Sequence, residues 1–166
     1  MLLIAFCWEI GRYIWRKTVF YLINIVKIIL IFKMYCMKAI KLTLLWLWQA
    51  PQHLLALAIF AVLKLAGKVV YVAENSNCLF IGLDVFIGLS LGRYIFVHQS
   101  YGEKTLKHEQ GHSVQSLFLG PLYLLVIGLP SLSGNIYDRI CHKGPAWYYR
   151  QPWEAWADRL GGVIRA

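Results

Sequence analysis

The sequence predicts an α+β protein in which N-terminal membrane helices precede a small antiparallel sheet and a minimal helical core. Hydrophobic residues make up 59% of the chain and charged residues only 15%, whereas an average soluble protein has about 25% charged residues. Two long apolar segments lie within the first 66 residues, and short β-branched and aromatic runs follow. We therefore divide the 166 residues into a membrane-associated helical region, 1–66, and a second domain, 67–166.

The first apolar segment, residues 18–32, is interrupted by Asn24 and Lys27. A spanning helix needs about 20 apolar residues, and a lysine at its centre costs about 2.5–3.5 kcal/mol. The segment is therefore a marginal membrane span. A second interpretation is that residues 1–36 are not native and that the protein starts at Met37, because this stretch lacks proline and aspartate. The intact mass of the natively produced protein distinguishes the two interpretations.

The second apolar segment, residues 42–63, carries no charged side chain apart from His53 if it is protonated. Its length is sufficient to cross a bilayer, and Trp46 and Trp48 suit a headgroup interface. The polar stretch 49–53 contains Pro51 and interrupts the run. A helical hairpin or a helix lying in the membrane plane is therefore an alternative to a clean span.

Residues 68–98 are predicted to form two to four antiparallel strands. The runs 68–74, 78–89 and 92–98 are rich in β-branched and aromatic residues, and Asn and Gly residues separate them. The apolar run 122–129 lies between two prolines and is too short to span a bilayer, so we expect it to be buried. Residues 131–151 are predicted to be a polar loop.

An H-E-x-x-H motif begins at His108, and a helix is expected to carry it. Ser100 and Glu103 have the spacing of a capping box, and Gly120 and Pro121 are a natural stop. On a helix His108 and His112 lie one turn apart on the same face, where both can bind one metal ion. Glu109 lies beside them, where its carboxylate can take a proton from metal-bound water.

A third metal ligand is expected in the segment 152–161, which reads as a short helix between Pro152 and Gly161. Catalytic zinc takes three protein ligands and leaves one position open. The segment holds Glu154 and Asp158, two of only eight acidic residues in the chain, one helical turn apart. One carboxylate as a ligand, with the second accepting a hydrogen bond from a ligating histidine, is a known arrangement.

The H-E-x-x-H motif followed by E-x-x-x-D resembles the gluzincin zinc metallopeptidases. The version found here is similar to membrane peptidases of the CAAX prenyl protease and HtpX type. The resemblance implies a minimal zincin-like core, in which zinc binds His108, His112 and Glu154 and in which Glu109 is the catalytic base. It also implies that Asp158 orients one histidine. The chain is much shorter than the classical peptidases.

The stretch 108–131 also resembles small uncharacterised bacterial proteins and C-terminal segments of Rhs-repeat proteins, with the pattern HExGHxxQS followed by GPLYLxVIGxPS.

Zincin-type enzymes bind an extended peptide along a sheet edge. By that resemblance residues 92–98 are the predicted substrate-facing strand, and a purely structural edge strand is the alternative. His98 is expected to be a surface residue. Tyr148 and Tyr149 precede Glu154, and either hydroxyl can stabilise an oxyanion near zinc.

The composition also limits the partners. The net charge of +9 comes from scattered Lys and Arg residues without a nucleic-acid-binding motif, so we expect contact with anionic membrane lipid. The four cysteines show no C-x-x-C spacing and are expected to be free thiols. The sequence thus predicts a zinc metallopeptidase of the bacterial inner membrane that hydrolyses peptide or protein substrates. The alternatives are a membrane-anchored metal-binding or degenerate zincin module without catalysis, and, from the Rhs resemblance, a toxin-type metallo-domain.

Overall fold

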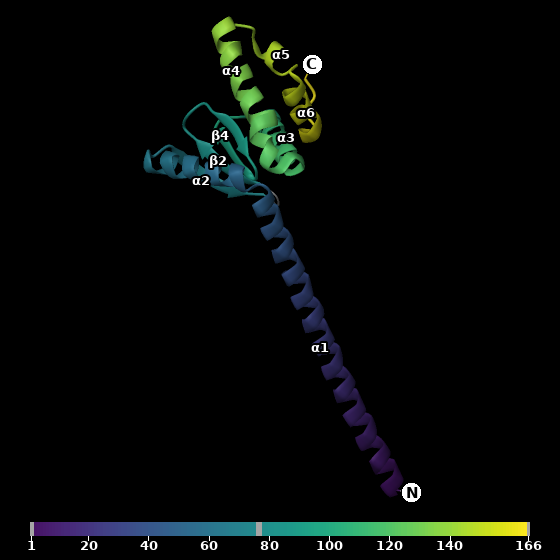
Figure 1. Ribbon diagram of the computed structural model, residues 1–166. Coiled ribbons are helices and arrows are strands. Elements are labelled where there is room, and N and C mark those ends of the chain that lie inside the picture. The colour runs from purple at the N-terminus through teal and green to yellow at the C-terminus, as the bar shows by residue number, and fades with distance from the viewer. Residues whose placement is uncertain (1, 76–77, 166) are drawn as a thin grey trace. The chain divides into compact units, whose positions relative to one another are not determined.

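The computed structural model describes residues 2–75 and 78–165 (Figure 1). The chain divides into two compact units, Met1–Leu44 and Leu45–Ala166. Helix α1 (Leu2–Trp48) supplies all the described structure of the first unit. Its length agrees with the sequence, because no glycine or proline lies between Gly11 and Pro51.

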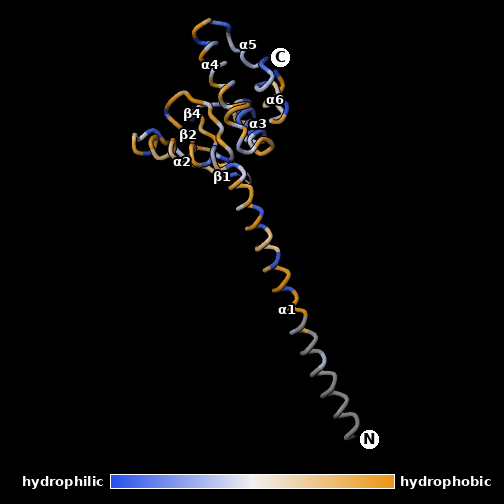
Figure 2. The backbone as a smooth tube through the Cα atoms, viewed as in Figure 1, coloured by the Kyte–Doolittle hydropathy of each residue, from blue (hydrophilic) through white to orange (hydrophobic). Residues whose placement is uncertain are grey.

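The described side chains of the first unit are mostly exposed, including Phe20 and Phe32. In the coloured part of this helix, Figure 2 shows apolar positions that polar ones interrupt repeatedly. Within the described part of the chain no single helix has both the length and the apolar character to cross a membrane. One pair of helical segments, Glu103–Leu122 and Leu124–Cys141, passes that test together, with a bend of 120° between them. The predicted N-terminal spans are therefore not confirmed.

The predicted segment 42–63 is divided between two helices, because α1 ends at Trp48 and α2 (Ala50–Leu65) begins after Gln49. The polar residues at this break are buried in the protein. The Trp48 indole donates a hydrogen bond to the Leu117 carbonyl (3.0 Å), and the Gln49 amide donates to Ser116 Oγ (3.0 Å). Gln52 donates to both Ser116 and the Gly120 carbonyl. The break thus attaches the start of α2 to the end of the helix that carries H-E-x-x-H.

Four strands form one mixed sheet, in the order β1-β2-β4-β3. They are β1 (Val69–Glu74), β2 (Leu79–Leu83), β3 (Gly88–Leu91) and β4 (Tyr94–His98). The pairs β1–β2 and β3–β4 are antiparallel, as predicted, but β2 and β4 are parallel. The prediction of an all-antiparallel sheet was therefore wrong for the central pair.

The parallel pairing of β2 with β4 follows from the tight β3–β4 hairpin. Gly92, with φ of +64°, allows a two-residue turn, and β4 then inserts between β3 and β2. The prediction that 92–98 is a substrate-facing edge strand was consequently wrong, because β4 pairs on both sides and β3 is the edge beside it. His98 is buried, and its ring stacks on Phe86 with centroids 3.9 Å apart. The prediction of a surface histidine was wrong as well.

Helices cover both faces of the sheet. Ala56 of α2 packs with Ile81, Leu83, Leu91 and Phe96 on one face. The alternate residues of β4, Ile95 and Val97, lie on the other face and pack against Leu106 of helix α3 (Glu103–Leu119). This alternation follows from the two-residue period of a strand. Both α2 and α3 are therefore held to the sheet by apolar burial.

The remaining chain is helical where a loop was predicted. A 3-10 turn (Gly120–Leu122) and a π-helical segment (Leu124–Gly128) lead into α4 (Leu129–Cys141), which α5 (Pro145–Tyr148) and α6 (Pro152–Gly161) follow. Pro130 lies in the first turn of α4, directly after the π-helical segment. Burial of the run 122–129 is confirmed for Tyr123 and Ile127, whereas Leu122, Leu125, Val126 and Leu129 are exposed.

The cysteines whose side chains are described, Cys36, Cys78 and Cys141, are free thiols, as predicted. The side chain of Cys7 lies outside the described part of the structure.

Candidate metal centre

Helix α3 carries the H-E-x-x-H residues, and all three of its ionisable side chains there, His108, Glu109 and His112, are buried. The helix does not begin with the predicted capping box. Its N-cap is Gly102, without a side-chain cap. Ser100 instead bonds to the His98 imidazole, with 2.7 Å between Oγ and Nδ1. The first turn of α3 is stabilised by an ion pair between Glu103 and Lys107 (2.8 Å).

Helix α6 carries Glu154 and Asp158 and packs closely on α3. Two glycines permit this approach, because a Cβ atom on Gly111 would lie 1.9 Å from the Ala157 carbonyl oxygen. A Cβ atom on Gly161 would lie 2.0 Å from the Lys107 carbonyl oxygen. Real Cβ atoms do not come that close to backbone. The two helices can therefore bring their polar residues together only because both positions are glycine.

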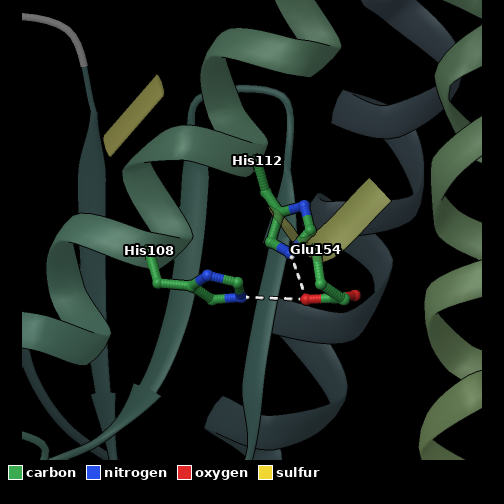
Figure 3. Close-up of side chains that lie close together, drawn as sticks. All are labelled: His108, His112 and Glu154. Carbon is green, nitrogen blue, oxygen red and sulfur yellow. Dashed lines mark hydrogen bonds and ion pairs between the residues drawn. The ribbon is translucent and has the colours of Figure 1, made fainter. Parts of the chain in front are cut away.

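The two histidines and Glu154 meet at one oxygen atom (Figure 3). Glu154 Oε2 lies 3.0 Å from His108 Nε2 and 3.3 Å from His112 Nε2. All three side chains are buried, and Glu154 is fully so. Glu154, which follows His112 by 42 positions in the sequence, thus joins the two histidines in a cluster that can bind a metal ion.

The Nδ1 atom of each imidazole ring already has a hydrogen-bond partner. His108 Nδ1 lies 2.7 Å from Asp158 Oδ1, and a carboxylate oxygen can only accept, so Nδ1 carries the proton. His112 Nδ1 lies 2.7 Å from Gln115 Oε1. The Gln115 amide nitrogen donates to the Trp153 carbonyl (2.7 Å), which fixes the amide orientation. His112 therefore also carries its proton on Nδ1.

As a consequence both Nε2 atoms direct lone pairs toward a carboxylate oxygen that also has only lone pairs. Three acceptors can share a buried space only with a proton or a cation between them. In a tetrahedral zinc site two ligand atoms lie roughly 3.3 Å apart, given zinc–nitrogen distances of about 2.0–2.1 Å. The separations around Glu154 Oε2 fit this value, so the donor set suits a metal ion.

The ionisation of the cluster follows the same geometry. Burial opposes ionisation of Glu154, but hydrogen bonds with His108 and His112 outweigh burial and hold the Glu154 pKa well below its usual range. Burial also opposes protonation of His112, yet Glu154 and the charge of Glu109 raise the His112 pKa overall. Negative charge at this cluster therefore favours a cation.

The Glu109 side chain extends from α3 to the edge strand β3. Ser90 Oγ lies 2.6 Å from Glu109 Oε2 and donates a hydrogen bond to it. A Cβ atom on Gly88 would lie 2.6 Å from Glu109 Oε1, so a larger residue there would displace the carboxylate from its present position. The strand is held in turn by Tyr123, whose hydroxyl donates to the Ser90 carbonyl (2.9 Å). No sequence motif identified Ser90 or Gly88 as neighbours of Glu109.

The two tyrosines predicted near the site have different positions. The Tyr148 hydroxyl donates to Glu154 Oε1 (2.9 Å) and accepts from Ser131 (2.9 Å). Burial and the charge of Glu154 raise the Tyr148 pKa, which keeps the hydroxyl protonated. The Tyr149 ring instead packs edge-on against His108, with ring centroids 5.2 Å apart. Of these two tyrosines, only Tyr148 thus forms a hydrogen bond through its hydroxyl to a candidate metal ligand, Glu154.

All the site residues predicted from the sequence thus lie together, whereas Ser90 and Gln115 were not anticipated. The signal for Gln115 was available, because a residue three positions after His112 lies on the same helical face. Comparison with known protein families, with characterised proteins and with solved structures found no match to this chain.

Proposed function

We propose that this protein is a zinc-dependent peptidase whose metal is held by His108, His112 and Glu154. The observation that carries the proposal is the convergence of two imidazole lone pairs on one carboxylate oxygen, with a second buried carboxylate, Glu109, on the adjacent helical position. Two nitrogens and one oxygen are a donor set typical of catalytic zinc, whereas calcium and magnesium prefer oxygen ligands alone. When bound, zinc supplies a Lewis acid that polarises a carbonyl group and lowers the pKa of water.

The protein residues have separate tasks in this proposal. Glu109 takes the proton of the attacking water and passes it to the leaving amine, and Ser90 keeps its carboxylate oriented. Asp158 and Gln115 hold the two imidazoles with Nε2 facing inward. Tyr148 holds Glu154 so that Oε2 faces the histidines while Oε1 accepts its hydroxyl.

An extended peptide is the substrate that fits the sheet best. Of the described strands, β3 has a neighbour on one side only, and Gly88 at its start lies against Glu109. The Ser90 carbonyl is already bonded to Tyr123. The Ile87 carbonyl accepts from His98 N on β4, so the backbone groups of the next residue, Gly88, face the open edge. We therefore propose that Gly88 pairs with the substrate backbone, which would bring a peptide bond next to the base by strand addition.

The experiment that tests this function combines metal analysis with one conservative variant. The full chain, purified in detergent without added metal, is expected to contain about one zinc per chain, and His112→Ala and Glu154→Ala are expected to lose it. Glu109→Gln should retain zinc but lose hydrolysis of a mixed peptide library, because an amide cannot accept the proton. Absence of zinc uptake by the wild type would contradict the proposal. Zinc binding without any hydrolysis would leave a binding module.

We further propose that the N-terminal half contacts an anionic membrane surface, such as that of the bacterial inner membrane. Nine of the 17 Lys and Arg residues lie between positions 10 and 73, and no Asp or Glu lies there, so this segment has a charge of +9, equal to the net charge of the whole chain. Large apolar side chains are exposed among these cations, including Phe20 and Phe32. Cations beside exposed apolar groups favour anionic lipid.

Co-sedimentation with vesicles tests this location. Vesicles containing phosphatidylglycerol are expected to bind the protein, whereas purely zwitterionic vesicles are expected to bind it less. High salt should weaken the binding, because it screens the attraction. Equal binding to both vesicle types would contradict the electrostatic part of the proposal.

A further inference from the structure

The residues that follow α6 turn back onto the metal centre. Gly162 adopts φ of +68°, a left-handed conformation that suits the end of a helix. The Val163 N–H then donates to the Asp158 carbonyl (2.8 Å). This turn carries Arg165 to the side chain of Asp158, one of the residues that contact the candidate ligands.

Arg165 holds the Asp158 carboxylate with two hydrogen bonds. Its Nη2 atom lies 2.8 Å from Asp158 Oδ1, and its Nε atom donates to Oδ2. The guanidinium also lies over the ring of Tyr149, with Cζ 3.2 Å from the ring centroid. The side chain is only 28% exposed. Such a bidentate and stacked geometry is specific to arginine, because a lysine offers one charged point without a plane.

Both groups that Arg165 touches are contacts of His108. The Asp158 oxygen that accepts from Arg165 Nη2 also accepts from His108 Nδ1 (2.7 Å). Tyr149, which lies under the guanidinium, also contacts the His108 imidazole, and the two ring planes are nearly perpendicular (88°). The second histidine has a different support, since Gln115 orients His112 without any contribution from this segment.

We propose that Arg165 is a positioning residue of the metal centre, which fixes the orientation of His108 through Asp158 and Tyr149. The inference rests on the metal centre of the proposed function and adds residues 162–165 to it. Without Arg165 the carboxylate of Asp158 can rotate about its side-chain bonds, and the Tyr149 ring loses its cover. The two neighbours that set the plane of the His108 imidazole then lose their fixed positions.

The test compares Arg165→Ala with Arg159→Ala in the full chain. Arg159 is an exposed arginine of α6, and among the described residues its side chain hydrogen-bonds to the Ala155 carbonyl of the same helix. Zinc affinity is measured by competition with a chelator, and circular dichroism reports folding. Arg165→Ala is expected to weaken zinc binding several-fold, less than the roughly 10–100-fold cost of losing a direct partner of a metal ligand, because Asp158 itself remains. Arg159→Ala should leave the affinity unchanged.

A second variant and a second readout make every result decisive. Arg165→Lys retains the charge, and it is expected to bind zinc more weakly than wild type; wild-type affinity in this variant would refute the planar clamp. If the circular dichroism signal shows that Arg165→Ala does not fold, the zinc affinity of Arg165→Lys alone decides whether Arg165 positions His108. Equal zinc affinity in Arg165→Ala and Arg159→Ala would overturn the proposal.

The metal-free protein separates this inference from the proposed function. Long-range nitrogen–proton correlation spectra report which nitrogen of His108 carries the proton and whether that proton is held. The Nδ1 proton is expected in wild type and Arg159→Ala and should broaden or vanish in Arg165→Ala. If wild type takes up no zinc, the proposed function fails. The positioning role is then decided by these spectra alone, and an unchanged His108 signal in Arg165→Ala would refute it.

Discussion

Gly111 is the position where one methyl group should do the greatest damage to the metal centre. In most helices Gly→Ala stabilises the protein by up to about 1 kcal/mol. Here the new Cβ atom would lie 1.9 Å from the Ala157 carbonyl oxygen, whereas ordinary contacts begin at 3.4 Å. The shortfall of about 1.5 Å falls on backbone, which cannot rotate away, so α3 and α6 must separate. We expect a loss of about 1–3 kcal/mol in the free energy of unfolding, the usual cost of overpacking.

The same separation acts on the ligands. His108 and His112 belong to α3 and Glu154 to α6, and their contact distances are 3.0 and 3.3 Å. A displacement of about 1 Å at a site of this size removes the common metal position. Gly111→Ala is therefore expected to lose zinc as well as stability.

Gly134→Ala is the matched control. Gly134 is also a buried helical glycine, but the nearest atoms to its added Cβ lie 3.6 Å away, in Trp153 and Tyr148. This variant should be neutral or slightly stabilising, as the helix propensity predicts. Urea unfolding followed by circular dichroism, together with zinc titration, measures both variants. If Gly111→Ala were as stable as Gly134→Ala and bound zinc equally well, the argument from helix approach would be refuted.

Three further predictions concern single side chains. Ser90→Ala removes the hydrogen bond to Glu109 and should lower kcat by roughly 10–100-fold, the equivalent of a charged hydrogen bond, without changing zinc content; unchanged kcat would show that Ser90 does not orient the base. Tyr148→Phe should weaken zinc binding about 10-fold by releasing Glu154; reduced kcat with wild-type zinc affinity would instead favour oxyanion stabilisation. Burial lowers the pKa of His53, the nearby Trp46 backbone offsets part of this effect, and the charge of Arg93 lowers the pKa further. Protonation of His53 therefore favours the unfolded chain, and wild type should lose stability relative to His53→Gln as the pH falls below about 6.5. Chemical unfolding of both proteins between pH 8 and pH 5 measures this difference, and a constant difference would contradict it.

Several elements could be read from local sequence, but their partners could not. The β-branched runs predicted strands in the region where four strands form, yet the parallel pairing of β2 with β4 depends on where the β3–β4 hairpin folds in space. The segment 42–63 has the composition of a membrane span, but Gln49 and Gln52 hydrogen-bond to Ser116, more than 60 residues later. Hydropathy cannot detect a distant partner that satisfies a polar group.

The sequence by itself determined the chemistry of the candidate site, because helical periodicity places His108 beside His112 and Glu154 in line with Asp158. These relations span four residues and need no knowledge of the fold. Only the tertiary structure decided that the two helices meet, which requires glycine at positions 111 and 161. It also decided that Ser90 and Arg165 reach Glu109 and Asp158. Such contacts join segments whose approach depends on packing of the whole chain, and no local pattern records that packing.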